Sequence, residues 1–202
     1  MVVVVTNPTA IDDEASIINN LFNEGLELLH IRKPNSTIEE IKMLLQKIET
    51  QNYHSIALHQ HHELCFGFGI GRLHFTETHR QKMTDEMLIK LKANNYILST
   101  SIHDVTAYNN LSAAFEYTFF GPVFNSISKT DYGAVVADDF VFPVKKDHCK
   151  VVAIAGINAA NIKKVKKMQF NGVAVLGSIW QNPSDSILQF KAIQKAWNQT
   201  GQ

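Results

Sequence analysis

The chain has 202 residues, 45% of them hydrophobic, which suits one compact domain with a large core. Its 19 basic and 19 acidic residues give a formal net charge of zero, so composition argues against nucleic acid and anionic membranes as partners. Two cysteines outside any CxxC motif, no leader-like N-terminus and no apolar run of membrane-spanning length predict a cytoplasmic protein without membrane contact.

Short β-branched runs alternate with amphipathic stretches along the chain. The predicted strands, in chain order, cover residues 2–5, 26–32, 55–58, 72–75, 96–102, 117–123, 150–157 and 172–179. The predicted helices cover residues 12–23, a stretch from Ser36 through 48, a short turn near Glu63, a stretch from Thr84 through 91, a stretch from Asp104 to about 115, and 187–197. Ser36 and Glu39 have the spacing of a capping box.

Eight strands, most of them followed by helices, predict an α/β fold that consists of a single (β/α)8 TIM barrel over residues 1–202. The nearly continuous apolar strands fit a parallel sheet that is covered on both sides. An open doubly wound sheet is the alternative, but no GxGxxG motif follows the first strand.

The sixth predicted strand leads into a loop with two hydroxyl side chains and a lysine, at Ser126, Ser128 and Lys129. Hydroxyl donors followed by a fixed positive charge suit the oxygens of a phosphate or pyrophosphate. The loop follows the C-terminal end of a strand, where parallel α/β folds build their sites.

The seventh and eighth predicted strands each end near a glycine, at Gly156 and at Gly177-Ser178. Glycine lets a ligand approach the backbone, and a following helix N-terminus presents free N–H groups to an anion. These glycines could instead serve only tight turns. Their position on adjacent strands, beside the Ser126–Lys129 loop, favours a phosphate site.

Other polar residues stand near the ends of earlier strands. Arg32 could clamp a phosphate, or could be a solvated arginine before a loop. Ser101 and His103 alternate on the fifth predicted strand and could contact a substrate, or could be satisfied within the barrel. The histidines around the third and fourth strands match no zinc motif and predict polar rim residues without a metal: His59, His61, His62, His74 and His79.

Taken together, these segments resemble the thiamine phosphate synthase family and its TenI-like relatives. The resemblance covers nearly the whole chain and is most specific at 121–124 with the Ser126–Lys129 loop, at 153–157 and at 172–179. It implies a barrel enzyme of thiamine biosynthesis that transfers hydroxymethylpyrimidine from its pyrophosphate to thiazole phosphate and releases pyrophosphate. A homodimer is compatible with a barrel of this size.

The resemblance also implies roles for individual residues. Arg32, Ser101 and Lys129 would contact the pyrophosphate. The thiazole phosphate would be held by the remaining matched positions, namely Ser126, Ser128, Gly156, Gly177 and Ser178. The predicted catalytic group comprises Lys129, Ser101 and His103.

The chain departs from the family at the magnesium ligands. The family uses Mg²⁺ held by two aspartates, and the matching positions here hold Gln60 and His79, so no metal ligand is predicted. Magnesium prefers hard, charged oxygen ligands, which neither side chain supplies. The strand-two motif also differs, with His30 and Pro34 in place of glutamine and lysine, and Lys33 could compensate for the lost lysine.

Two alternatives to the synthase reaction remain open. One is the TenI-like isomerisation of the thiazole phosphate, in which His103 or His74 would shuttle the proton, because Pro122 occupies the position of the usual histidine. The other is a non-catalytic barrel that binds a thiazole phosphate.

Overall fold

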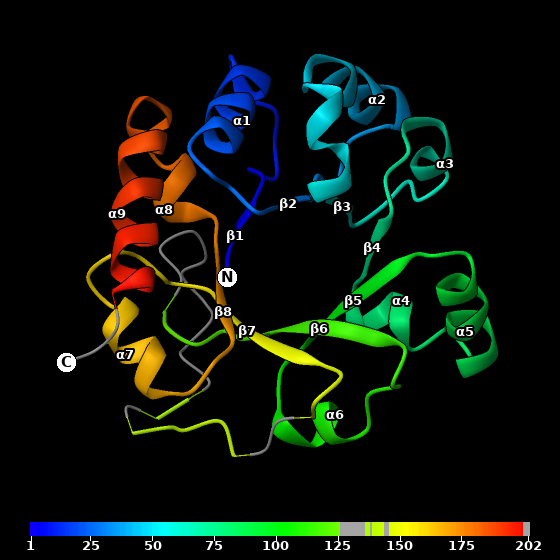
Figure 1. Cartoon of the computed structure of the whole chain (residues 1–202), viewed down its shortest axis with the longest axis vertical. Helices are drawn as coiled ribbons and strands as arrows, with labels where there is room; N and C mark the ends of the chain where they lie inside the picture. The colour runs from blue at the N-terminus through cyan, green and yellow to red at the C-terminus, as the bar shows by residue number, and fades with distance from the viewer. Residues whose placement is uncertain (126–135, 138, 144–145, 200–202) are drawn as a thin grey trace.

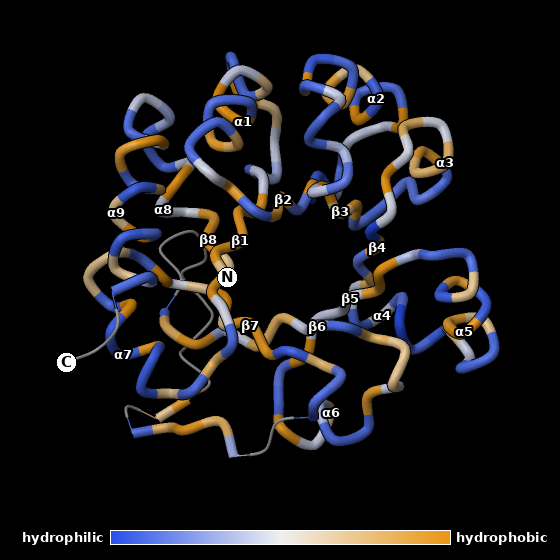
Figure 2. The backbone as a smooth tube through the Cα atoms, viewed as in Figure 1, coloured by the Kyte–Doolittle hydropathy of each residue, from blue (hydrophilic) through white to orange (hydrophobic). Residues whose placement is uncertain are grey.

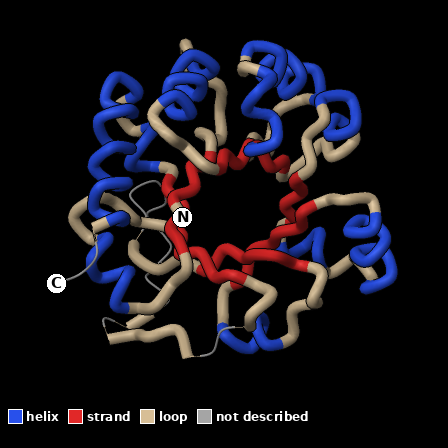
Figure 3. Tube along the Cα trace, in the orientation of Figure 1, coloured by secondary structure: helices blue, strands red, loops and turns tan. Residues whose placement is uncertain are grey.

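The eight strands close into a parallel barrel in the order β1-β2-β3-β4-β5-β6-β7-β8. This is a computed structural model that describes residues 1–125, 136–137, 139–143 and 146–199. Figure 3 shows the strands as an inner ring with helices outside it. The strands are β1 Val2–Val5, β2 Leu28–Ile31, β3 Ile56–Leu58, β4 Arg72–Phe75, β5 Ile97–Ile102, β6 Phe115–Phe120, β7 Lys150–Ile154 and β8 Gly172–Val175. The predicted (β/α)8 barrel is confirmed.

Helical segments connect most of the strands around the outside of the ring (Figure 1). In the first half of the chain these are α1 Glu14–Asn23, α2 Ile38–Lys47, η1 Thr50–Ser55, α3 Leu64–Phe68, α4 Glu77–Arg80, α5 Asp85–Ala93 and α6 Val105–Asn109. The second half adds α7 Ile162–Lys167, α8 Gly177–Trp180, η2 Pro183–Asp185 and α9 Ser186–Asn198. None of the helices in the described ranges has the length and apolar character needed to span a bilayer.

Side chains alternate between two cores along each strand. Val2 and Val4 of β1 pack outward with the helices, whereas Val3 and Val5 point into the barrel. The outer cluster is large and mixes strand and helix residues such as Ile18 and Phe190. Figure 2 shows the matching pattern on the outer helices, whose turns change between hydrophobic and hydrophilic.

The inner core is small. It comprises Val3, Val5, Leu28, Ala57, Tyr117, Phe119, Val152 and Ala174. The interior of a TIM barrel is usually filled by branched apolar side chains. Here the polar residues His30, His74 and Ser99 are also buried at inward positions of β2, β4 and β5. The inside of the barrel is therefore partly polar.

Several predicted boundaries differ from the structure. The capping box of α2 is formed by Thr37 and Glu40, one residue later than the predicted Ser36 and Glu39. Both pairs have a hydroxyl and a glutamate three apart, so the spacing alone does not choose between them. Helix α6 ends at Asn109, well before 115, because Phe115 already belongs to β6. Strands β6, β7 and β8 end earlier than predicted, and α8 begins at Gly177.

Candidate active site

A cavity of about 450 Å³ opens at the C-terminal ends of the strands. This volume lies in the range of small-molecule sites. Residues at or beyond the ends of strands β2 to β8 line it, including Arg32, His59, His74, Glu77, Ser101, His103, Gly121, Gly156, Gly177 and Ser178. Active sites of TIM barrels lie at this face, so the cavity is the candidate active site.

Most of the residues predicted for the site meet in this cavity. Six of them line it: Arg32, Ser101, His103, Gly156, Gly177 and Ser178. The predicted anion loop with Ser126, Ser128 and Lys129 lies outside the described residues. The described chain before this loop ends at Asn125, whose carbonyl oxygen lies close to Gly156 of the cavity.

Gly156 is required by the backbone itself. Its φ is +66°, and a Cβ at this position would lie 2.5 Å from the carbonyl oxygen of Asn125 and 2.7 Å from Cβ of Phe124. The preceding residue, Ala155, also has a positive φ of 80°, which is a strained conformation for a residue with a side chain. The Phe124 N–H donates to the Ala155 carbonyl, so this turn holds the segment after β6 against the end of β7.

Gly177 and Ser178 begin the short helix α8 after β8. Nothing lies within 4 Å of a Cβ placed on Gly177, so the space beside its backbone is open. The Ser178 hydroxyl is buried and has no hydrogen-bond partner among the described residues. A buried hydroxyl without a partner is costly, and a ligand oxygen in the cavity would satisfy it.

Arg32 lies just beyond β2, and hydrogen bonds of its backbone with Thr6 fix its position. Its N–H donates to the Thr6 hydroxyl at 2.9 Å, and that hydroxyl donates to the Arg32 carbonyl at 3.3 Å. Its guanidinium has no hydrogen bond or ion pair with the described residues. Arg32 therefore brings a positive charge to the cavity that is free to bind an anion.

Ser101 and His103 both line the cavity but have different surroundings. The Ser101 hydroxyl hydrogen-bonds to Nε2 of His74 at 3.0 Å. His103 lies past the end of β5, with Nδ1 at 2.6 Å from the Gly121 carbonyl and Nε2 at 3.7 Å from a carboxylate oxygen of Glu77. The side chain of His103 is half exposed, so it can reach a bound ligand.

Glu77 is a cavity residue that the sequence reasoning missed. It is the first residue of α4 and follows Thr76, whose hydroxyl accepts from the His79 N–H and so caps that helix. The Thr76-Glu77 pair directly after a predicted strand is an N-cap pattern, and that signal could have placed a carboxylate at the site.

The prediction of polar rim histidines is wrong for His59 and His74. Both are buried, and His74 belongs to an inward position of β4. Burial lowers the pKa of His74 to about 3, with smaller effects from His62 and Arg32. Burial also holds the pKa of His59 well below its ordinary value, and the neighbouring rings of His74 and His30 add to this. Both imidazoles are neutral at physiological pH.

The two family magnesium positions do not fit magnesium in this chain. The amide nitrogen of Gln60 donates to the Lys33 carbonyl, and the ring of His79 stacks on His62 at 5.6 Å and contacts the Phe75 ring edge-on. Neither offers a charged oxygen. Lys33 does not compensate for the lost lysine either, because its ammonium is buried against Glu14 at 2.8 Å.

Comparison with known proteins shows what the whole chain is similar to. The family model for thiamine monophosphate synthase matches residues 2–179. A thiamine-phosphate synthase of a Hydrogenobaculum species is 23% identical over 83% of this chain and 78% of its own. The one from Staphylococcus saprophyticus is 28% identical over 52% of this chain, and the match spans about half (54%) of that relative.

Two solved structures extend the likeness to the whole fold. A thiamine phosphate pyrophosphorylase from Bacteroides thetaiotaomicron is 26% identical with a TM-score of 0.74, covering 100% of this chain and 99% of its own. One from Pyrococcus furiosus has a TM-score of 0.73 at 20% identity, covering 97% of this chain and 94% of its own, which shows the same fold. The match of the family model over most of the barrel shows that the chain belongs to the thiamine monophosphate synthase family.

Proposed function

We propose that the chain is a thiamine-phosphate synthase, which transfers hydroxymethylpyrimidine from its pyrophosphate to thiazole phosphate and releases pyrophosphate. The observation that carries the proposal is a cavity with anion-binding groups contributed by different strands. Arg32 brings an unpaired cation from β2, and Ser178 brings a buried hydroxyl without a described partner from the turn after β8. Two separate phosphate-bearing substrates would fit this arrangement.

The chain's own residues would bind and orient the two substrates. Arg32 and the predicted Lys129 would neutralise the pyrophosphate as its bond to the pyrimidine methylene breaks, and Ser101 would donate a hydrogen bond to it. Gly177 and Ser178, with Gly156 and the predicted Ser126 and Ser128, would hold the thiazole phosphate. The thiazole nitrogen would then face the developing pyrimidinyl cation and form the new bond. Holding both reactants converts their encounter into a step within one complex.

Magnesium is the cofactor that family membership suggests, but the residues present do not fit it. The positions of its two carboxylates hold Gln60 and His79, which are occupied by other contacts. The charge of the leaving pyrophosphate would rest mainly on cationic side chains. Turnover slower than that of a magnesium-assisted enzyme is therefore expected.

The structure and the relatives favour this reaction over the isomerisation of thiazole phosphate. The relatives reported above are named as synthases or pyrophosphorylases. His74 is a poor proton shuttle near neutral pH, because its pKa lies at about 3 and both ring nitrogens bond to serine hydroxyls. We also propose that the enzyme acts on small phosphorylated substrates in the cytoplasm. That it forms a homodimer stays a prediction.

The test is formation of thiamine phosphate from the two substrates at high enzyme concentration, followed by chromatography, with and without Mg²⁺. The Arg32→Gln variant is expected to raise KM for the pyrimidine pyrophosphate by roughly 10- to 100-fold, because it loses charged hydrogen bonds. Lys42→Gln removes an equal charge from the surface of α2 and should change nothing. Saturable binding of both substrates without any product would overturn the synthase and favour a non-catalytic barrel.

A further inference from the structure

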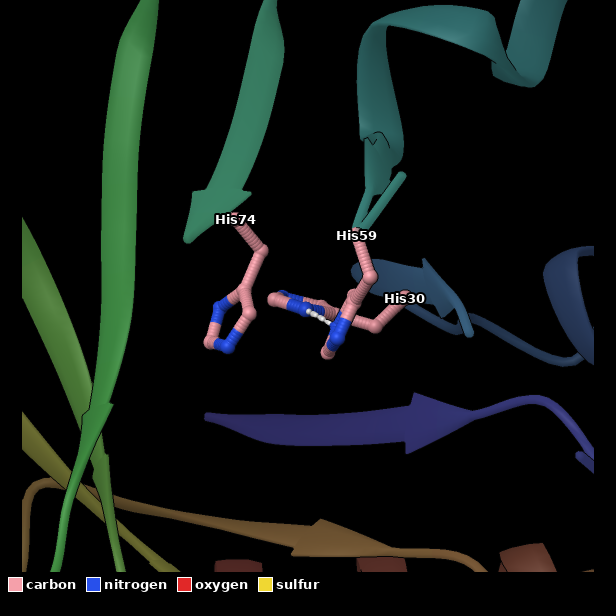
Figure 4. A group of neighbouring side chains, drawn as sticks. All are labelled: His30, His59 and His74. Atoms are coloured by element: carbon pink, nitrogen blue, oxygen red, sulfur yellow. Dashed lines mark hydrogen bonds between the residues drawn. The ribbon is translucent and has the colours of Figure 1, made fainter. Parts of the chain in front are cut away.

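Three histidines converge inside the barrel below the cavity. His30 comes from β2, His59 directly follows β3, and His74 comes from β4, so three neighbouring strands supply them. One nitrogen of each ring lies within 4.8 Å of the others, and Nδ1 of His30 is 2.9 Å from Nε2 of His59 (Figure 4). All three are buried, with 0%, 7% and 0% of their surface exposed.

The surroundings of this trihistidine cluster keep the rings uncharged. Burial is the largest cause of the lowered pKa of each ring, and the other ionisable groups that lower it are neighbouring histidines and the arginines Arg32 and Arg72. Among the described residues, no carboxylate contributes to these shifts. A neutral imidazole offers a lone pair, which is the form that binds a metal ion.

Hydroxyl groups hold the outer side of the cluster. Nε2 of His30 is 2.8 Å from the Tyr117 hydroxyl, and the two nitrogens of His74 are each 3.0 Å from the hydroxyls of Ser99 and Ser101. A hydroxyl can donate or accept, so Nδ1 of His30 can offer a lone pair to an ion while Nε2 stays bonded to Tyr117. His74 can offer one in the same way when one of its two serine hydroxyls turns away. Outer partners of this kind orient histidines around metal ions.

We propose that His30, His59 and His74 form a binding site for a transition-metal dication, with Zn²⁺ the best match. Three imidazole nitrogens suit Zn²⁺ far better than Mg²⁺, which requires oxygen ligands. His59 and His74 line the cavity, so a fourth position would be open to water or a ligand oxygen from that side. This site is separate from the family magnesium positions and does not depend on the proposed transferase reaction.

Loading the site requires one ring to turn. The rings of His59 and His74 are stacked, with centroids 3.9 Å apart and planes 23° apart, so their lone pairs run side by side. His74 is fixed within β4 by two hydroxyls, whereas His59 lies beyond β3 and its ring bonds only to His30 among the described residues. His59 is therefore the ring that would turn toward the ion.

The experiment is a titration of the untagged, EDTA-dialysed protein with Co²⁺, followed by its visible absorption bands, and then displacement of Co²⁺ by Zn²⁺. We expect one ion per chain and the strong bands of a four-coordinate site. His59→Gln should weaken Co²⁺ binding. It is the most informative variant, because this loop position can change without disturbing a strand. Tyr117→Phe should keep the stoichiometry and weaken affinity by about 10- to 100-fold.

The matched control is His54→Gln, which removes a histidine at the exposed end of η1, away from the cavity. It should bind Co²⁺ like the unchanged protein. Thermal unfolding with and without Zn²⁺ confirms that each variant is folded. The proposal is overturned if the unchanged protein binds no stoichiometric ion, if His59→Gln binds as tightly, or if His54→Gln weakens binding equally. Any of these outcomes would leave the cluster as a neutral hydrogen-bonded network.

Discussion

At the scale of single residues, Gly156 and Gly177 both follow the end of a strand, but the structure requires a glycine only at position 156. Gly156 has a positive φ, and a Cβ there would collide with the backbone after β6. Gly177 has open space where a Cβ would lie and no unusual φ. The fold therefore explains Gly156 without a ligand, whereas no contact with the described residues requires a glycine at position 177.

Because of this contrast, a substitution of Gly177 can test ligand binding without changing stability. Gly177→Ala should leave the free energy of unfolding nearly unchanged, because the new methyl group meets nothing. It should weaken binding of thiazole phosphate by about tenfold or more, because the methyl group occupies space beside the anion. Calorimetric titration and urea unfolding measure the two effects. Gly67→Ala, also in open space but outside the cavity, is the control. Unchanged binding in Gly177→Ala would remove this turn from the phosphate site.

At the scale of elements, a buried ion pair joins the end of β2 to helix α1. The Lys33 ammonium is 2.8 Å from Glu14 and also donates to the carbonyls of Asn7 and Thr9, each at 2.9 Å. The two side chains are only 4% and 5% exposed. This pair fixes the loop between β1 and α1 against the strand that carries Arg32.

Removing one partner should be costly. Lys33→Met leaves a buried carboxylate and two carbonyls without their donor, and is expected to lower the free energy of unfolding by about 3–5 kcal/mol. Adding Glu14→Leu should restore part of the loss, since the uncompensated charge is then gone. Urea unfolding of both single variants and the double variant measures the coupling. Equal stability of Lys33→Met and the unchanged protein would contradict a structural role for the pair.

The elements also show what could be predicted from the sequence. The eight strands were located because β-branched runs mark them, and six of the predicted site residues meet because strand ends converge in a barrel. The trihistidine cluster was missed because His59 and His74 were assigned to the rim, although alternation from Leu73 and Phe75 turns His74 inward. The capping-box residue and the contact of Lys33 depend on packing, which spacing alone does not reveal.

At the scale of the whole molecule, the buried histidines link stability to pH. Their pKa values in the folded protein lie below the ordinary value of 6.5, and that of His74 lies at about 3. The unfolded chain therefore takes up protons first as the pH falls. Their stabilising contribution is complete above the unfolded pKa and is lost progressively as the pH falls below it.

We accordingly expect the free energy of unfolding to fall between about pH 7 and about pH 5, by up to ~1.4 kcal/mol per pH unit for each histidine. Urea unfolding in EDTA across this range measures the slope. His59→Gln should reduce the slope by about one proton, and the exposed-site variant His54→Gln is the matched control. A slope that is the same in His59→Gln and the unchanged protein would show that His59 is not held neutral by the fold.

The hydrogen bond from the Trp180 indole to the Val5 carbonyl, 2.7 Å long, can form only late in the synthesis of the chain. These residues are 175 positions apart, and β1 pairs with β8 close to the same place. A ribosome adds about 5–20 residues per second, so the valine-rich first strand waits on the order of ten seconds or more before its second neighbour exists. During that interval its free edge can pair with other nascent chains. Ring closure therefore leaves this edge of β1 unpaired for longer than any other strand edge of the barrel while the protein is made.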